Sequence, residues 1–123
     1  MIDTPRLAGV TSVRIKAVLV PWLMGKPSMP NAEAVLEAIT QAGYTPAVDV
    51  WLGLDVASTE FFRDGRYCLE GDGQTYTSEE FIQVIMDWIE RYPILTIEDA
   101  MAEDDWDGWE MITQAVGNRI QLT

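Results

Sequence analysis

Two short apolar runs, each ending in a carboxylate, constrain the fold of this 123-residue chain more than any other feature. The first run covers residues 48–54 and is followed by Asp55, and the second covers residues 93–97 and is followed by Glu98 and Asp99. An apolar run that ends directly in an acid is typical of a buried parallel strand with a polar group at its C-terminal tip. In β/α barrels and open α/β sheets, the chemistry gathers at that edge. Two such acids, on strands separated by one helix, are suited to holding a hard divalent cation.

Helix signals surround both of these predicted strands. The first helix is expected to begin with Asn31 as its N-cap and to end at Gly43. Thr77 and Glu80 have the spacing of a capping box, and the helix that they open ends before residue 93. A third helix follows the acidic stretch at residues 103–105 and ends at Gly117.

The order of these elements predicts an α/β fold. Strands are expected at residues 48–54 and 94–97, with a further strand start at residues 119–123 and turns at 64–65 and 72–73 that indicate a small hairpin. Helices that alternate with strands in this way build a parallel sheet through crossover connections. We therefore expect about three parallel strands with crossover helices and a small hairpin.

The first 30 residues differ in composition from the rest. They carry four basic residues and one acid, whereas the whole chain has a formal charge of −12. Prolines and a glycine interrupt this segment after residue 20, and residues 10–20 alternate weakly enough to suggest one strand. We expect residues 1–30 to form a separate, poorly ordered leader, followed by a domain over residues 31–123.

Composition excludes several classes of function. The charge of −12 argues against partners such as nucleic acid or an anionic membrane surface, and no apolar run is long enough to cross a bilayer. The absence of histidine rules out Ser-His-Asp and Cys-His catalysis within this chain, as well as His metal ligands. Cys68 is the sole cysteine, which excludes an internal disulfide and fits a reducing, cytoplasmic location.

Several motifs, in order and with matching spacing, resemble the enolase family. The stretch at residues 52–62 resembles the enolase segment with a metal-binding Asp followed by a loop of small residues and Ser/Thr-Glu-Phe. Similar matches follow at residues 64–67, 92–99, 102–109 and 117–122. Together they cover the chain from about Asn31 to Leu122 without obvious gaps.

This resemblance implies a specific function and fold. Enolases (phosphopyruvate hydratases) are lyases of glycolysis that dehydrate 2-phosphoglycerate to phosphoenolpyruvate with Mg²⁺ on a modified β/α barrel. Asp55 and Glu98 fall on two of the family's three metal-ligand positions, and Glu98 also falls beside the substrate. The resemblance thus implies a partial TIM-like barrel over residues 31–123, a cytoplasmic location and a parent that self-associates or forms homodimers.

Other parts of the family pattern are not found in these 123 residues. The third metal Asp is expected just after Thr123, and the two active-site lysines further on, whereas the lysines present are Lys16 and Lys26. The family's acidic loop before Asn31 is replaced by residues 23–30. We therefore expect no catalytic residue here and an inactive, marginally stable isolated chain that tends to associate. The alternative is a non-catalytic acidic interaction module, or a vestigial product, that associates with full-length enolase.

Other acidic and aromatic residues have simpler interpretations. On spacing alone Asp99 competes with Glu98 as the functional acid, and the family pattern favours Glu98. The acidic stretch at residues 103–105 is expected to be a solvated loop and helix start. Glu60 is expected to make a structural loop contact, and Cys68 to be an ordinary buried or half-buried residue. Three tryptophans are expected to pack in the core: Trp88, Trp106 and Trp109.

Overall fold

A computed structural model describes residues 13–18, 30–69 and 73–123 of the chain. The strand expected within residues 10–20 is confirmed as β1 (Val13–Val18). The remainder of the predicted leader, including its expected disorder, lies outside the described residues up to Pro30.

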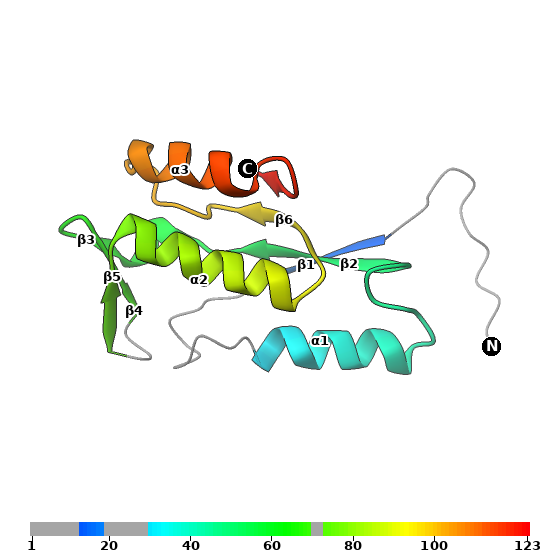
Figure 1. Ribbon diagram of the computed structural model, residues 1–123. Coiled ribbons are helices and arrows are strands. Elements are labelled where there is room, and N and C mark those ends of the chain that lie inside the picture. The colour runs from blue at the N-terminus through cyan, green and yellow to red at the C-terminus, as the bar shows by residue number, and fades with distance from the viewer. Residues whose placement is uncertain (1–12, 19–29, 70–72) are drawn as a thin grey trace.

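The described residues form one parallel sheet and one antiparallel sheet. The parallel sheet has the order β1-β2-β6-β7, in which β2 is Val50–Asp55, β6 is Ile94–Glu98 and β7 is Gln121–Leu122. This arrangement confirms the α/β fold class and the three strands expected after residue 31. The predicted hairpin region is a three-stranded antiparallel sheet of β3 (Phe62–Arg63), β4 (Arg66–Leu69) and β5 (Gln74–Tyr76). A short 3₁₀ helix, η2 (Ser58–Phe61), connects β2 to this smaller sheet (Figure 1).

Three α-helices accompany the sheets: α1 (Pro30–Gln41), α2 (Ser78–Arg91) and α3 (Trp106–Val116). The capping box of α2 is confirmed, since the Glu80 backbone N–H donates to Thr77 Oγ1 at 3.2 Å and the Thr77 N–H donates to Glu80 Oε2 at 2.8 Å. The prediction of Asn31 as N-cap is wrong, because α1 already begins at Pro30. Proline is favoured in a first helical turn, where its missing N–H has no intrahelical partner to lose. Among the described residues, no helix has the length and apolarity needed to cross a bilayer.

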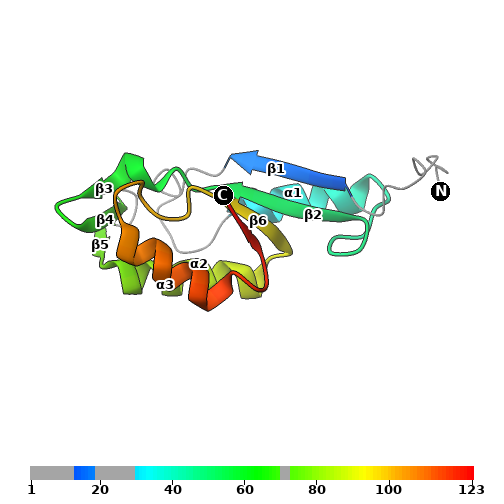
Figure 2. The same ribbon diagram turned by 90° about the horizontal axis from the view of Figure 1, so that it is seen from above.

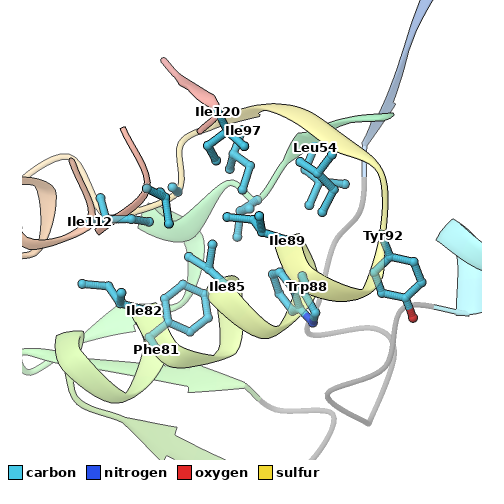
Figure 3. Close-up of a cluster of buried hydrophobic side chains, with 14 of the residues drawn as sticks. Leu54, Phe81, Ile82, Ile85, Trp88, Ile89, Tyr92, Ile97, Ile112 and Ile120 are labelled. Carbon is cyan, nitrogen blue, oxygen red and sulfur yellow. The ribbon is translucent and has the colours of Figure 1, made fainter. Parts of the chain in front are cut away.

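The core lies between the parallel sheet and the helices α2 and α3, which cover the same side of the sheet (Figure 2). Val50, Leu52 and Leu54 of β2 are buried, as expected for alternate residues that point to one face of a strand. Figure 3 shows side chains of α2 directed at residues of β2, β6, α3 and the segment before β7. The buried residues of α2 are Phe81, Ile82, Ile85, Trp88 and Ile89.

The three tryptophans have different environments. Trp88 is buried, and Trp109 is half-buried against the core and donates its Nε1–H to the Ala102 carbonyl at 3.0 Å. The prediction of core packing is wrong for Trp106, whose exposed fraction is 78%. The buried face of α3 carries Gly108 and Ile112. Trp106 precedes Gly108 by two residues, which places it roughly 200° around the helix from that face.

A partly buried hydrogen-bond network joins the smaller sheet to the helices. The Tyr67 hydroxyl donates to Asp105 Oδ2 at 2.6 Å and accepts from the Ala102 N–H at 3.0 Å. Ser78 Oγ also donates to Asp105 Oδ2 at 2.6 Å, and Asp105 Oδ1 caps α3 by accepting from the Gly108 N–H at 3.0 Å. One carboxylate therefore links β4 and the first turns of α2 and α3.

The Tyr67 hydroxyl makes the stability of the chain dependent on alkaline pH. Burial, and next its hydrogen bond to Asp105, raise the pKa of Tyr67 above its usual value. The unfolded chain loses this proton near the ordinary tyrosine pKa of about 10, while the folded chain retains it. Stability from Tyr67 is therefore complete below about pH 10 and falls as the pH rises further.

We expect Tyr67→Phe to lower the melting temperature at neutral pH and to flatten its decline above about pH 10. The melting temperatures of both proteins are measured by circular dichroism as a function of pH. An equally steep decline above about pH 10 in the original chain and in Tyr67→Phe would contradict the role given to the Tyr67 hydroxyl.

Candidate metal centre

Asp55 and Glu98 end two neighbouring parallel strands. Asp55 is the last residue of β2 and Glu98 the last residue of β6, and the strand register pairs them directly. In a parallel pair, residues that face each other in this way point to the same side of the sheet. Asp55 lies on the side opposite Leu52 and Leu54, which face the helical core. The two acids therefore lie next to each other at one edge of the sheet.

An irregularity in β6 sets this pairing. Leu52 pairs with Ile94, but the next residue, Gly53, pairs with Thr96, so that Leu95 is an extra residue in β6. A register without this extra residue would place an apolar side chain opposite Asp55 instead of Glu98. Bulges of this kind re-aim side chains next to functional sites. The register shift therefore brings the two acids together.

A third acid joins the pair. Asp55, Glu98 and Asp99 each offer one carboxylate oxygen, and these oxygens lie within 4.8 Å of one another. Asp55 and Glu98 are half-buried and Asp99 is exposed, while the Oδ1 atom of Asp55 is shielded from solvent. The sequence led us to choose between Glu98 and Asp99, whereas the structure places both in the cluster. Asp99 has a φ of 50°, in the left-handed region, and the chain turns there as it leaves β6.

The loops that follow the two strands are joined by hydrogen bonds. The Val56 N–H donates to the Glu98 carbonyl at 3.0 Å, and the Ser58 N–H donates to the Asp99 carbonyl at 3.2 Å. Ser58 Oγ donates to the Ala100 carbonyl at 2.7 Å. Ser58 is not among the predicted site residues, although a serine in the loop directly after a strand that ends in a predicted ligand is a signal that could have identified it.

The donor set of this cluster suits a hard divalent cation. Two unit charges about 4 Å apart repel by about 4 kcal/mol at an effective dielectric constant of about 20. A bound cation would replace this repulsion with attraction. Oxygens on opposite sides of one Mg²⁺ lie about 4.2 Å apart, twice the bond length of about 2.1 Å. The observed spacing within 4.8 Å therefore fits one such ion with little movement.

The other acidic candidates lie outside this cluster. Glu103 and Asp104 are exposed, as expected for a solvated loop, and Asp105 is the N-cap of α3, as expected for a helix start. The prediction of solvation does not hold for Asp105, whose half-buried carboxylate accepts hydrogen bonds from Tyr67 and Ser78. Glu60 is exposed in η2, and Cys68 is half-buried as expected.

The fold and the cluster together define a class of protein. Parallel strands that alternate with helices and carry acidic residues at their C-terminal ends are found in β/α-barrel proteins. The family model described as "Enolase, C-terminal TIM barrel domain" matches residues 26–123, which is most of the chain. The chain belongs to the enolase family, and its sheet and helices are part of that barrel.

The loop after Asp55 contains a residue whose backbone favours glycine. Ala57 has a φ of 50°, a left-handed conformation that costs roughly 1–2 kcal/mol for a residue with a side chain. We expect Ala57→Gly to leave the free energy of unfolding unchanged or to raise it by up to about 1 kcal/mol. The matched control is Ala115→Gly in α3, which should lower that free energy by about 1 kcal/mol. A larger loss at Ala57 than at Ala115 in urea unfolding would show that the left-handed turn is not formed.

Proposed function

We propose that Asp55 and Glu98 are Mg²⁺ ligands of an enolase-type site, in a parent cytoplasmic enzyme of glycolysis that dehydrates 2-phosphoglycerate to phosphoenolpyruvate. The observation that carries this proposal is the cluster of carboxylate oxygens within 4.8 Å at the ends of β2 and β6, in a chain of the enolase family. The ligand set agrees with the preference of Mg²⁺ for oxygen donors.

The chemistry of such a dehydration explains why carboxylates are needed at this edge. Removal of the proton beside a carboxylate group leaves an enediolate with concentrated negative charge. A bound Mg²⁺ supplies the positive charge that stabilises it. The part of this chain is to hold and orient the ligand oxygens: Asp55 and Glu98 are half-buried at the ends of paired strands, so their backbones are fixed by the sheet. Asp99, being exposed, adds negative charge at the rim of the cluster.

The same carboxylates make substrate binding depend on the cation. 2-Phosphoglycerate carries a carboxylate and a phosphate, and three carboxylates within 4.8 Å of one another repel it. The net charge of −12 strengthens this repulsion at low ionic strength. In this proposal, therefore, the substrate binds beside Glu98 only after a cation has neutralised the carboxylates.

Mg²⁺ should stabilise the folded chain through this cluster. A ligand at 100 times its dissociation constant adds about 2.7 kcal/mol to the free energy of unfolding, so we expect the melting temperature to rise with Mg²⁺ concentration. Asp55→Asn and Glu98→Gln should abolish the rise, and Asp99→Asn should reduce it less because Asp99 is exposed. The control is Asp104→Asn, an exposed acid outside the cluster, which should behave like the original chain. We expect binding weaker than micromolar, and a micromolar affinity by titration calorimetry would contradict this.

A polypeptide of these 123 residues should have no hydratase activity. Its lysines are Lys16 and Lys26, and neither falls at a position where the family resemblance places an active-site lysine. A positioned proton-transfer group commonly contributes about 10²–10⁴-fold to the rate. We expect ultraviolet absorbance to detect no phosphoenolpyruvate above the blank. Product formation that requires Mg²⁺, is lost in Glu98→Gln and persists in Asp104→Asn would overturn this expectation.

A further inference from the structure

We propose that Ser58 is a positioning residue that fixes the loop after Asp55 against the loop after Glu98, and so holds the two ligands at the spacing that a cation requires. This inference rests on the proposed metal-binding function of Asp55 and Glu98. It adds a residue that touches neither the cation nor the substrate.

The burial of Ser58 is the first observation. Its exposed fraction is 0%, so its hydroxyl is shielded from solvent. A buried hydroxyl is costly unless it is hydrogen-bonded. Ser58 Oγ meets this requirement by donating to the carbonyl of Ala100, which is itself fully buried, at 2.7 Å.

The position of this bond is the second observation. The regular pairing of β2 with β6 ends at Asp55 and Glu98, but cross-loop bonds continue beyond it. The Val56 and Ser58 N–H groups bind the carbonyls of Glu98 and Asp99, and the Ser58 hydroxyl then binds the next carbonyl along the chain. The Ser58 side chain thus adds one more bond between the two loops, beyond the last backbone bond.

The backbone geometry gives the third observation. Each of the two loops that follow Asp55 and Glu98 contains a residue other than glycine in the left-handed conformation. These residues are Ala57 in the first loop and Asp99 in the second, each with a φ of 50°. Such conformations persist only where the surroundings determine them strongly. The two Ser58 bonds fall directly beside both of these residues, on the Asp99 and Ala100 carbonyls, and are therefore placed to hold both turns.

Removal of the hydroxyl should loosen this arrangement selectively. In Ser58→Ala the Ala100 carbonyl loses a donor in a buried site, so the loops must separate or admit water to satisfy it. Metal sites are sensitive to such supporting partners, whose loss typically weakens metal binding by about 10–100-fold. Tyr67→Phe is the matched control, because it also removes a largely buried hydroxyl that contacts the β6–α3 loop, but at Ala102 and not at the carbonyls next to the acids.

Two measurements on the 123-residue chain separate this role from general stability. The first is the amide exchange of Val56 in metal-free protein by NMR, since this N–H bonds to the Glu98 carbonyl. The second is the affinity for Mn²⁺, used as a probe for Mg²⁺ and measured from the electron paramagnetic resonance signal of the free ion. We expect Ser58→Ala to speed Val56 exchange at least about tenfold and to weaken Mn²⁺ binding by about 10–100-fold. Tyr67→Phe should change both by less than about twofold, although it lowers the melting temperature.

The outcomes distinguish the two proposals. Unchanged Val56 exchange in Ser58→Ala, or equal loss of Mn²⁺ affinity in Tyr67→Phe, would overturn the role of Ser58. A chain that binds no Mn²⁺ would refute the proposed metal function, while Val56 exchange would still decide whether Ser58 holds the loops together. If Ser58→Ala does not fold, Ser58→Cys replaces it, because a thiol keeps a weaker donor at nearly the same volume. An intermediate loss in Ser58→Cys supports the positioning role, and values equal to the original chain contradict it.

Discussion

The pairing of β2 with β6 is the constraint on which the rest of this structure depends. Both strands are short, and their core-facing residues are buried against α2 and α3. The extra residue Leu95 shifts the register of β6 by one position, and this shift places Glu98 opposite Asp55. Because side chains on a strand alternate between the two faces, an unshifted register would place the acids on opposite faces of the sheet. A single irregularity thus decides whether the two carboxylates form one cluster.

The helices fix this pairing from one side of the sheet. The apolar face of α2 packs on Leu54 and Ile97, the residues that directly precede Asp55 and Glu98 (Figure 3). The carboxylates therefore sit one residue beyond the packed core, on backbone that has little freedom to move. Asp105 adds a second restraint, because it joins Tyr67, Ser78 and the first turn of α3. This network fixes the start of α3 against β4 and α2.

Sequence reasoning predicted the elements whose signals are local. The capping box at Thr77, the apolar runs of β2 and β6 and the acids at their ends depend on neighbouring residues, and all are found where expected. The features it missed depend on contacts between distant segments. The bulge at Leu95 exists only relative to β2, and the hydroxyl of Ser58 gains its partner from a loop 42 residues further along the chain. Trp106 shows the converse: its apolar character suggested burial, but its angular position on α3 directs it to solvent.

The central claim is that Asp55 and Glu98 bind one cation together. Its most direct test is paramagnetic broadening of the carboxylate ¹³C signals of the chain as Mn²⁺ is added in substoichiometric amounts. The account predicts that the side-chain carboxylate signals of Asp55 and Glu98 broaden first and in parallel, while that of the exposed Asp104 stays sharp. Broadening that instead follows solvent exposure, with Asp104 affected before Asp55, would contradict it.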